Sequence, residues 1–215
     1  MFSWNKQNID WFIASSTYSS FHKNLAKFIS KKIDKDSTIL DIGAGLGCLD
    51  YELSNYCKKI TLIEPNKDAY EFLIKNKKPN FEILNTTYEE YEQTNHETCD
   101  YLLLSFFSRM DTKDNYQRLS KLCNKKIIYI RNEGHGSNKD FINYLNYKRL
   151  NYYLERHEID FSQPLLLEDI DGFINTYYGS KSQEEKRQLK KRVIKKDNYY
   201  LFRNTKQISI FTIIK

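Results

Sequence analysis

Three glycines and one acid lie close together near the start of the chain, in a pattern typical of ligand-binding loops. They are Asp41, Gly43, Gly45 and Gly47. Residues 37–40 predict the end of a buried strand, and residues 48–57 predict a helix. Glycines at such a junction let the backbone approach a ligand closely, and the helix start offers free N–H groups to an anionic group. The carboxylate of Asp41 would repel a pyrophosphate, but not a ligand that carries both a carboxylate and a cation.

A second acid follows the next predicted strand. Residues 60–63 form a short apolar run that Glu64 closes. In open α/β sheets an acid about 20 residues past the glycines takes ribose hydroxyls, and both strand ends lie at one edge of the sheet. S-adenosylmethionine (SAM) fits both acids, because it has a zwitterionic amino-acid tail, a positive sulfonium and a ribose. The alternatives are a dinucleotide, whose fingerprint has a glycine in place of Cys48, and a glycine turn that binds nothing.

These segments resemble the first two motifs of the class I SAM-dependent methyltransferases. The matching residues are 39–47 for the first motif and 62–66 for the second. The looser matches are residues 81–90 with the third strand and adenine-side loop, 99–105 and 126–131 with the fourth and fifth strands, and 199–203 and 207–214 with the closing antiparallel pair. The resemblance therefore covers residues 37–135 and 198–215.

The resemblance implies a Rossmann-like α/β fold with a doubly wound, mostly parallel seven-stranded sheet. It also implies SAM as cosubstrate. Asp41, the three glycines and Glu64 would bind the cofactor, and Thr87 and Tyr88 would lie beside its adenine.

The chain of 215 residues has no Pro/Gly/Ser-rich linker, so we expect a single domain. Apolar residues from Tyr18 to Ile33 repeat at helical spacing, and residues 1–36 are expected to form an N-terminal helical lid. Residues 37–135 would form the cofactor core and residues 198–215 the closing strands. Residues 136–197 are expected to form a helical cap over the substrate side. The first of its helices would begin at Ser137, with an apolar face that continues to Tyr152. The second would span residues 168–178, and the third would begin at Ser182, in a capping box.

Candidates for the acceptor site follow the fourth and fifth strands. DNA- and RNA-adenine enzymes of the resembled family carry an Asn/Asp-Pro-Pro-Tyr-like motif after strand four, which holds a flipped base. The chain has SFFSR from Ser105 to Arg109, so the missing proline pair argues against base methylation, and the two aromatics suit a small acceptor. Arg109 could hold an anionic group. His135 is the best general-base candidate. The simple alternatives are that the two phenylalanines belong to the core and that His135 is a loop histidine without a role.

Charge and cysteine content limit the partners, metal sites and localisation that we expect. The net charge is +6, from 34 basic and 28 acidic residues, and lysine occurs throughout. The helix from Ser182 carries a basic run that is either a solvated face or an anion-binding surface. Four cysteines without a short Cys-x-x-Cys spacing predict buried thiols and no metal site. No apolar run approaches membrane length, so we expect a cytoplasmic protein without a membrane partner.

We therefore expect a methyltransferase that acts on a small-molecule acceptor, with nucleic acid an unlikely partner. Two alternatives remain open. One is an RNA or protein methyltransferase that docks its substrate on the basic helix. The other is a protein that binds SAM without catalysis.

Overall fold

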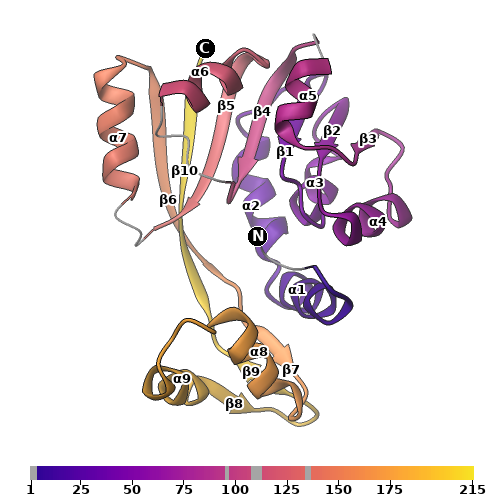
Figure 1. Ribbon diagram of the computed structural model, residues 1–215, viewed down its shortest axis with the longest axis vertical. Helices are drawn as coiled ribbons and strands as arrows, with labels where there is room; N and C mark the ends of the chain where they lie inside the picture. The colour runs from indigo at the N-terminus through magenta and orange to yellow at the C-terminus, as the bar shows by residue number, and fades with distance from the viewer. Residues whose placement is uncertain (1–3, 95–96, 108–112, 134–136) are drawn as a thin grey trace. The chain divides into compact units, whose positions relative to one another are not determined.

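The computed structural model describes residues 4–94, 97–107, 113–133 and 137–215 (Figure 1). The chain divides into two compact units. The large unit comprises His22–Glu158 and Gln207–Lys215, and the small unit comprises Met1–Phe21 and Ile159–Lys206. The small unit is thus assembled from the start of the chain and from a segment that interrupts the large unit.

A seven-stranded sheet forms the centre of the large unit, in the order β3-β2-β1-β4-β5-β10-β6. Its strands are β1 (Thr38–Ile42), β2 (Lys59–Ile63), β3 (Phe81–Leu84), β4 (Cys99–Ser105), β5 (Cys123–Asn132), β6 (Tyr152–Asp160) and β10 (Thr205–Ile214). The first five pair in parallel, and β10 pairs antiparallel with β5. The strand order reverses between β1 and β4, where open α/β sheets bind their ligands. The predicted fold class is confirmed.

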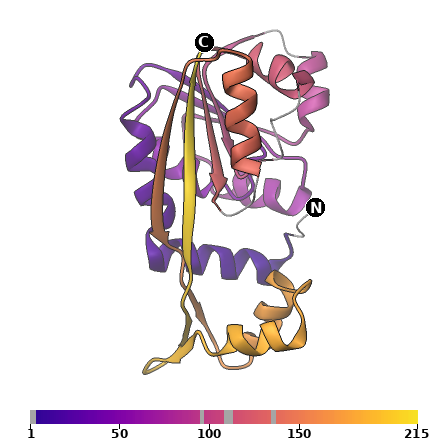
Figure 2. The ribbon, with the colours of Figure 1, turned by 90° about the vertical axis from the view of Figure 1, so that its left-hand side faces the viewer.

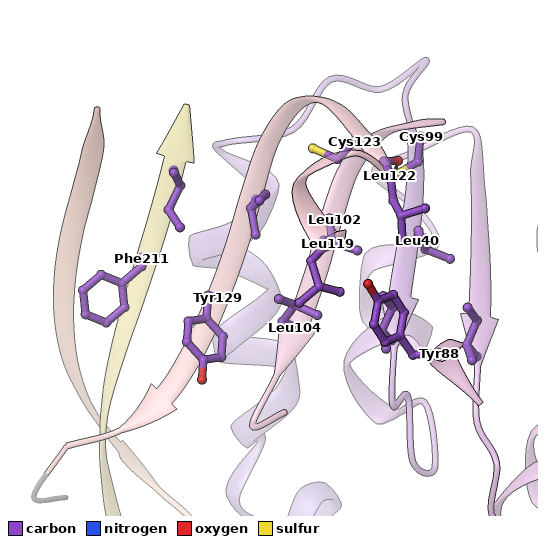
Figure 3. Close-up of a cluster of buried hydrophobic side chains, with 14 of the residues drawn as sticks. Leu40, Tyr88, Cys99, Leu102, Leu104, Leu119, Leu122, Cys123, Tyr129 and Phe211 are labelled. Atoms are coloured by element: carbon purple, nitrogen blue, oxygen red, sulfur yellow. Dashed lines mark hydrogen bonds between the residues drawn. The ribbon is translucent and has the colours of Figure 1, made fainter. Parts of the chain in front are cut away.

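Helices cover both faces of this sheet, which is why its central strands are continuous apolar runs. The helices are α2 (Phe21–Ser30), α3 (Cys48–Leu53), α4 (Lys67–Lys75), α5 (Tyr88–Thr94), α6 (Lys113–Ser120) and α7 (Ser137–Tyr147). Figure 2 shows α2 and α7 on opposite faces. On the face that carries α6, Leu40, Leu102 and Leu104 of the sheet pack with Leu119 of the helix (Figure 3). Each is at most 2% exposed, and burial of such a side chain stabilises the fold by about 2 kcal/mol.

The small unit has its own apolar core and its own sheet. Its elements are α1 (Lys6–Ser19), β7 (Gln163–Leu165), α8 (Asp169–Tyr177), α9 (Gln183–Lys190), β8 (Val193–Lys195) and β9 (Tyr200–Phe202). The three strands are antiparallel in the order β7-β9-β8. Trp11 of α1, Phe173 of α8 and Phe202 of β9 are buried against one another. The predicted capping box at Ser182 and Glu185 is present at the start of α9.

The closing strands differ from the prediction. Residues 199–203 do not pair with residues 207–214: β9 pairs with β7 and β8, whereas β10 lies between β5 and β6. The strand beside β10 is β6, which begins at Tyr152, a residue predicted to lie on a helix. The preceding helix ends earlier because Arg149 adopts a left-handed conformation with φ 53°, which a glycine would normally signal. Segment 136–197 is therefore helical only in part, and its role as a cap stays a prediction.

The N-terminal helix also differs in detail. Ser20 has φ 53° and separates α1 from α2, so the apolar spacing from Tyr18 to Ile33 does not belong to one helix. The role of residues 1–36 as a lid stays a prediction. No helix in the described ranges is long and apolar enough to cross a membrane.

Candidate functional site

The glycine loop follows β1 and is held against the end of β2. Gly43, Gly45 and Gly47 have φ values of 78°, 57° and 65°, in the left-handed region that other residues rarely adopt. The N–H groups of Gly43 and Ala44 both donate to the carbonyl oxygen of Ile63, at 2.9 and 3.1 Å. The loop is thereby fixed at the carboxyl edge of the sheet, where the two neighbouring strands end.

Gly47 is required for packing. A Cβ atom on Gly47 would lie 2.5 Å from Cδ2 of Leu73 in α4, far inside van der Waals contact. Gly47 precedes α3, which has only six residues and ends at Leu53, before the predicted end at Cys57. The third glycine therefore lets the loop approach α4.

Glu64, at the end of β2, bonds to the glycine loop. Its Oε2 accepts a hydrogen bond from the N–H of Gly45, and its Oε1 accepts one from the N–H of Asn66, each at 2.8 Å. Burial raises the pKa of the Glu64 carboxyl, while these two N–H groups lower it. Each carboxylate oxygen has two lone pairs, so each can accept a further hydrogen bond. The structure thus brings together the loop and the acid predicted to hold a ribose.

Asp41 faces a second buried acid that the sequence analysis did not select. Asp41 is 1% exposed and Asp50 of α3 is fully buried. Burial raises the pKa of Asp41 well above its usual range, and the adjacent Asp50 raises it further. Burial likewise raises the pKa of Asp50. Two carboxyls this close cannot both ionise readily, so the pair holds a proton. The sequence signal was the position of Asp50 beside Leu49 and Leu53, on the buried side of a helix.

Asp41 also has an atom available to a ligand. Among the residues that the structure describes, its Oδ1 is buried and has no hydrogen-bond partner, and neither side-chain oxygen of Asp50 has one. Buried carboxyl oxygens are normally satisfied, and one shared proton cannot satisfy all three, so a further donor would fit here. An ammonium group such as that of the SAM amino-acid tail would supply it.

Thr87 and Tyr88, the residues predicted to lie beside the adenine, both contribute to the local fold. Thr87 caps α5, since its N–H donates to Glu90 and its Oγ1 accepts from the Glu90 N–H. Tyr88 is 7% exposed and packs in the hydrophobic cluster. Its ring in Figure 3 lies with the core side chains. Asn85, which the sequence analysis missed, donates from its side chain to the carbonyl oxygen of Glu64 at 2.8 Å and so joins the ends of β3 and β2.

The end of β4 completes the site. Phe106 has φ 54°, and its N–H donates to the carbonyl oxygen of Ile130 at 3.0 Å. The ring of the next residue, Phe107, lies against the glycine loop, 3.1 Å from where a Cβ atom on Gly43 would be. An aromatic side chain and Ser105 are thus held beside the cofactor edge. Arg109 and His135 lie outside the described residues.

Comparison with known proteins identifies the family. The family model of ribosomal RNA adenine dimethylases matches residues 19–126, half of the chain, and this range contains the glycine loop, Glu64 and Phe107. The chain belongs to this family. It is a SAM-dependent methyltransferase.

Solved structures show the same fold in other methyltransferases. A candidate RNA methyltransferase from Pyrococcus horikoshii aligns with a TM-score of 0.55 at 14% identity, over 90% of this chain and 82% of its own. Precorrin-6Y C5,15-methyltransferase from Geobacter metallireducens aligns with a TM-score of 0.57 at 13% identity, over 89% and 86%. The tRNA m1G37 methyltransferase of Methanocaldococcus jannaschii (M. jannaschii) aligns with a TM-score of 0.52 at 14% identity, over 89% and 49%. A search of curated protein sequences finds no match.

Family membership corrects two expectations. The small-molecule acceptor and the view that nucleic acid is an unlikely partner are both wrong, because the matching family is one of ribosomal RNA adenine dimethylases. The missing proline pair misled the sequence analysis. Proline fixes φ near −65°, so the φ of 54° at Phe106 excludes a proline at that position of the turn after β4.

The cysteines offer little chemistry. Burial raises the pKa of the Cys57 and Cys99 thiols to about 12, so neither forms a thiolate near neutral pH. Within the described ranges, no group of three or more His, Cys, Asp or Glu side chains could hold a metal ion.

Proposed function

We propose that this ribosomal RNA adenine dimethylase family member transfers a methyl group from SAM to an adenine of RNA. The observation that carries the proposal is the contact between Phe107 and the glycine loop. A flat aromatic ring beside the cofactor loop can stack on a base that has left its helix, as enzymes that modify bases require. The family to which the chain belongs supports adenine in RNA as that base.

The same edge of the sheet offers a place for each part of SAM. Asp41 would accept the ammonium group of the amino-acid tail through its unpartnered Oδ1. Glu64 would accept the ribose hydroxyls with the lone pairs that Gly45 and Asn66 leave open. Asn85 supports this arrangement indirectly, by holding the strand that Glu64 ends. Bound SAM supplies a methyl carbon that its sulfonium activates for displacement.

The residues after β4 would position the acceptor. Phe107 would hold the adenine ring, and the hydroxyl and carbonyl groups at Ser105 would accept from its amino group. A bond forms between the amino nitrogen and the methyl carbon as the carbon–sulfur bond breaks, and the nitrogen then loses a proton to water. Because the reaction needs an in-line approach, positioning supplies most of the acceleration. The left-handed backbone of Phe106 is consistent with a positioning role, since strained backbone conformations are common at functional sites.

The direct test is methyl transfer to RNA. The full chain would be incubated with methyl-labelled SAM and an unmodified ribosomal RNA transcript, which is then digested to nucleosides and analysed by mass spectrometry. We expect the label on N6 of adenosine. Label only on another nucleoside, on protein or in the small-molecule fraction would refute the proposal.

Variants of Phe107 separate stacking from cofactor binding. Phe107→Leu keeps an apolar side chain but removes the flat ring, so we expect kcat to fall at least tenfold, with SAM affinity changed less than threefold. Phe107→Tyr keeps the ring and is the matched control, expected to retain activity. Equal loss in both variants would mean that the residue only packs against Gly43.

A further inference from the structure

The basic charge of the chain is concentrated in one segment of the small unit. Residues 186–206 hold nine basic residues and one acidic residue, Asp197, a net charge of +8. The remaining 25 basic and 27 acidic residues give the rest of the chain a net charge of −2. The overall charge of +6 is therefore not a general habit of composition. It lies in the part of α9 that follows Glu185 and in the β8–β9 hairpin.

Within this segment, two of the three basic residues of α9 pair with acids, and the third bonds to an amide oxygen. Lys186 donates to Asn175 at 3.1 Å, Arg187 pairs with Glu184 at 3.0 Å, and Lys190 pairs with Asp171 at 2.5 Å. Cations already held by acids gain less from a phosphate than unpaired cations do. The basic helix noted in the sequence is therefore the weaker half of the basic segment.

Four cations at the end of α9 and along the β8–β9 hairpin have no acidic partner. These are Lys191, Lys195, Lys196 and Arg203; all four are exposed, and within the described ranges no carboxylate oxygen lies within ion-pair distance of any of them. The hairpin holds them on one short, ordered scaffold. The N–H of Arg203 donates to the carbonyl oxygen of Arg192 at 3.1 Å, and the N–H of Lys196 donates to that of Tyr199 at 2.8 Å.

Two tyrosines accompany these cations. Tyr18 of α1 is 44% exposed, and its ring meets that of Tyr199 edge-on, with 6.2 Å between the ring centroids. The pKa of Tyr18 is raised, first by its hydrogen bond with Tyr199, while the charge of Arg203 opposes the rise. An exposed ring and a half-buried ring near cations are suited to RNA, because RNA phosphates are negatively charged and unpaired bases stack on aromatic side chains.

We propose that the β8–β9 hairpin is the surface on which the chain docks its RNA, with Lys191, Lys195, Lys196 and Arg203 contacting phosphates. This inference rests on the proposed RNA substrate. The family match ends at residue 126, so the hairpin lies wholly outside it and its role follows from charge and exposure alone. The whole of Ile159–Lys206, which includes the hairpin, interrupts the large unit in sequence.

The test is a fourfold variant, Lys191→Gln, Lys195→Gln, Lys196→Gln and Arg203→Gln. Its RNA affinity would be measured by fluorescence anisotropy on a labelled ribosomal RNA transcript between 50 and 200 mM salt. Each lost phosphate contact lowers the slope of log affinity against log salt by about 0.7 to 0.9. Four contacts lower it by about 3, so over this range the wild type should lose about a hundredfold more affinity than the variant.

A matched control changes the same charge elsewhere. Lys35, Lys58, Lys75 and Lys121 are exposed lysines of the large unit, located just before β1, β2 and β5 or at the end of α4. They therefore lie at the amino edge of the parallel strands, away from the cofactor edge. Their fourfold change to Gln should leave the salt slope within about one contact of the wild type. Calorimetry with SAM and thermal unfolding should match the wild type in both variants.

The outcomes separate this inference from the proposed function. A wild type that methylates adenine in RNA while the hairpin variant keeps its affinity and salt slope would overturn the docking surface alone. Equal losses in both fourfold variants would do the same, because the effect would then be one of net charge. A wild type that binds and methylates no RNA would overturn both.

Discussion

Substitution of Asp50 by Asn is expected to stabilise the protein at neutral and alkaline pH. Asp50 is fully buried beside Asp41, and burial raises its pKa to about 7. An unfolded chain has an ordinary Asp pKa of about 3.9. Between these values the folded state holds a proton that the unfolded state has released. The contribution of this proton to the free energy of unfolding is therefore fully present below about pH 4, falls as the pH rises, and is lost above about pH 7.

The size of the effect follows from this difference. Three pKa units at about 1.4 kcal/mol each set an upper limit of about 4 kcal/mol, and sharing the proton with Asp41 reduces the part that belongs to Asp50. Asn keeps the shape of the side chain, carries no charge at any pH, and can donate from its amide to Asp41. We expect the free energy of unfolding of Asp50→Asn to exceed that of the wild type by about 1–3 kcal/mol at pH 8, with little difference at pH 4.5.

The assay is urea unfolding at several pH values between 4.5 and 8, followed by far-ultraviolet circular dichroism. Glu71→Gln is the matched control, because Glu71 lies on the exposed side of α4 at the surface. Its difference from the wild type should be small and flat with pH. An Asp50→Asn variant that is less stable than the wild type at pH 8 would refute the idea that ionisation of the buried pair opposes folding.

Three further predictions concern the cofactor edge. Gly47→Ala should destabilise the fold by at least about 1–2 kcal/mol in urea unfolding, because φ is 65° there and the new Cβ would meet Leu73; an unchanged midpoint would refute the packing role. Glu64→Gln should weaken SAM binding by about 1–3 kcal/mol in calorimetry, since an NH2 group that cannot accept replaces one of the two oxygens that accept from Gly45 and Asn66; unchanged affinity would show that the ribose is held elsewhere. SAM binding should release protons, because an ammonium beside Asp41 favours the ionised form of a carboxyl whose pKa is raised well above its usual range; binding heats that do not depend on the ionisation enthalpy of the buffer would contradict this.

The sequence predicted the cofactor edge well because its signals are local. Glycine is strongly favoured where φ is positive, and Gly43, Gly45 and Gly47 all have positive φ. Glu64 closes an apolar strand, so its place at the sheet edge follows from the strand. Asp50 was missed because its pairing with Asp41 depends on how α3 packs against β1, which the sequence does not give.

The second half of the chain was predicted less well, because its elements are defined by distant partners. β6 alternates between exposed and partly buried residues, and its strand character depends on β10, which follows about 45 residues later. β7, β8 and β9 have three residues each, too few for a periodic pattern. Ser20 and Arg149 end helices with left-handed conformations at residues other than glycine, so the chain carries no sequence mark of either boundary.

The charge of the chain was visible in the sequence, but its meaning was not. Counting lysines treats Lys190 and Lys195 alike, whereas the fold pairs the first with Asp171 and leaves the second exposed on β8. Pairing depends on which acids the fold brings near, and here the acidic first turns of α8 and α9 supply them. The cations left without an acidic partner in this segment are Lys191, Lys195, Lys196 and Arg203, at the end of α9 and on the hairpin. A count of lysines does not contain this difference in pairing, and it is this difference that favours the hairpin over the helix as the proposed RNA surface.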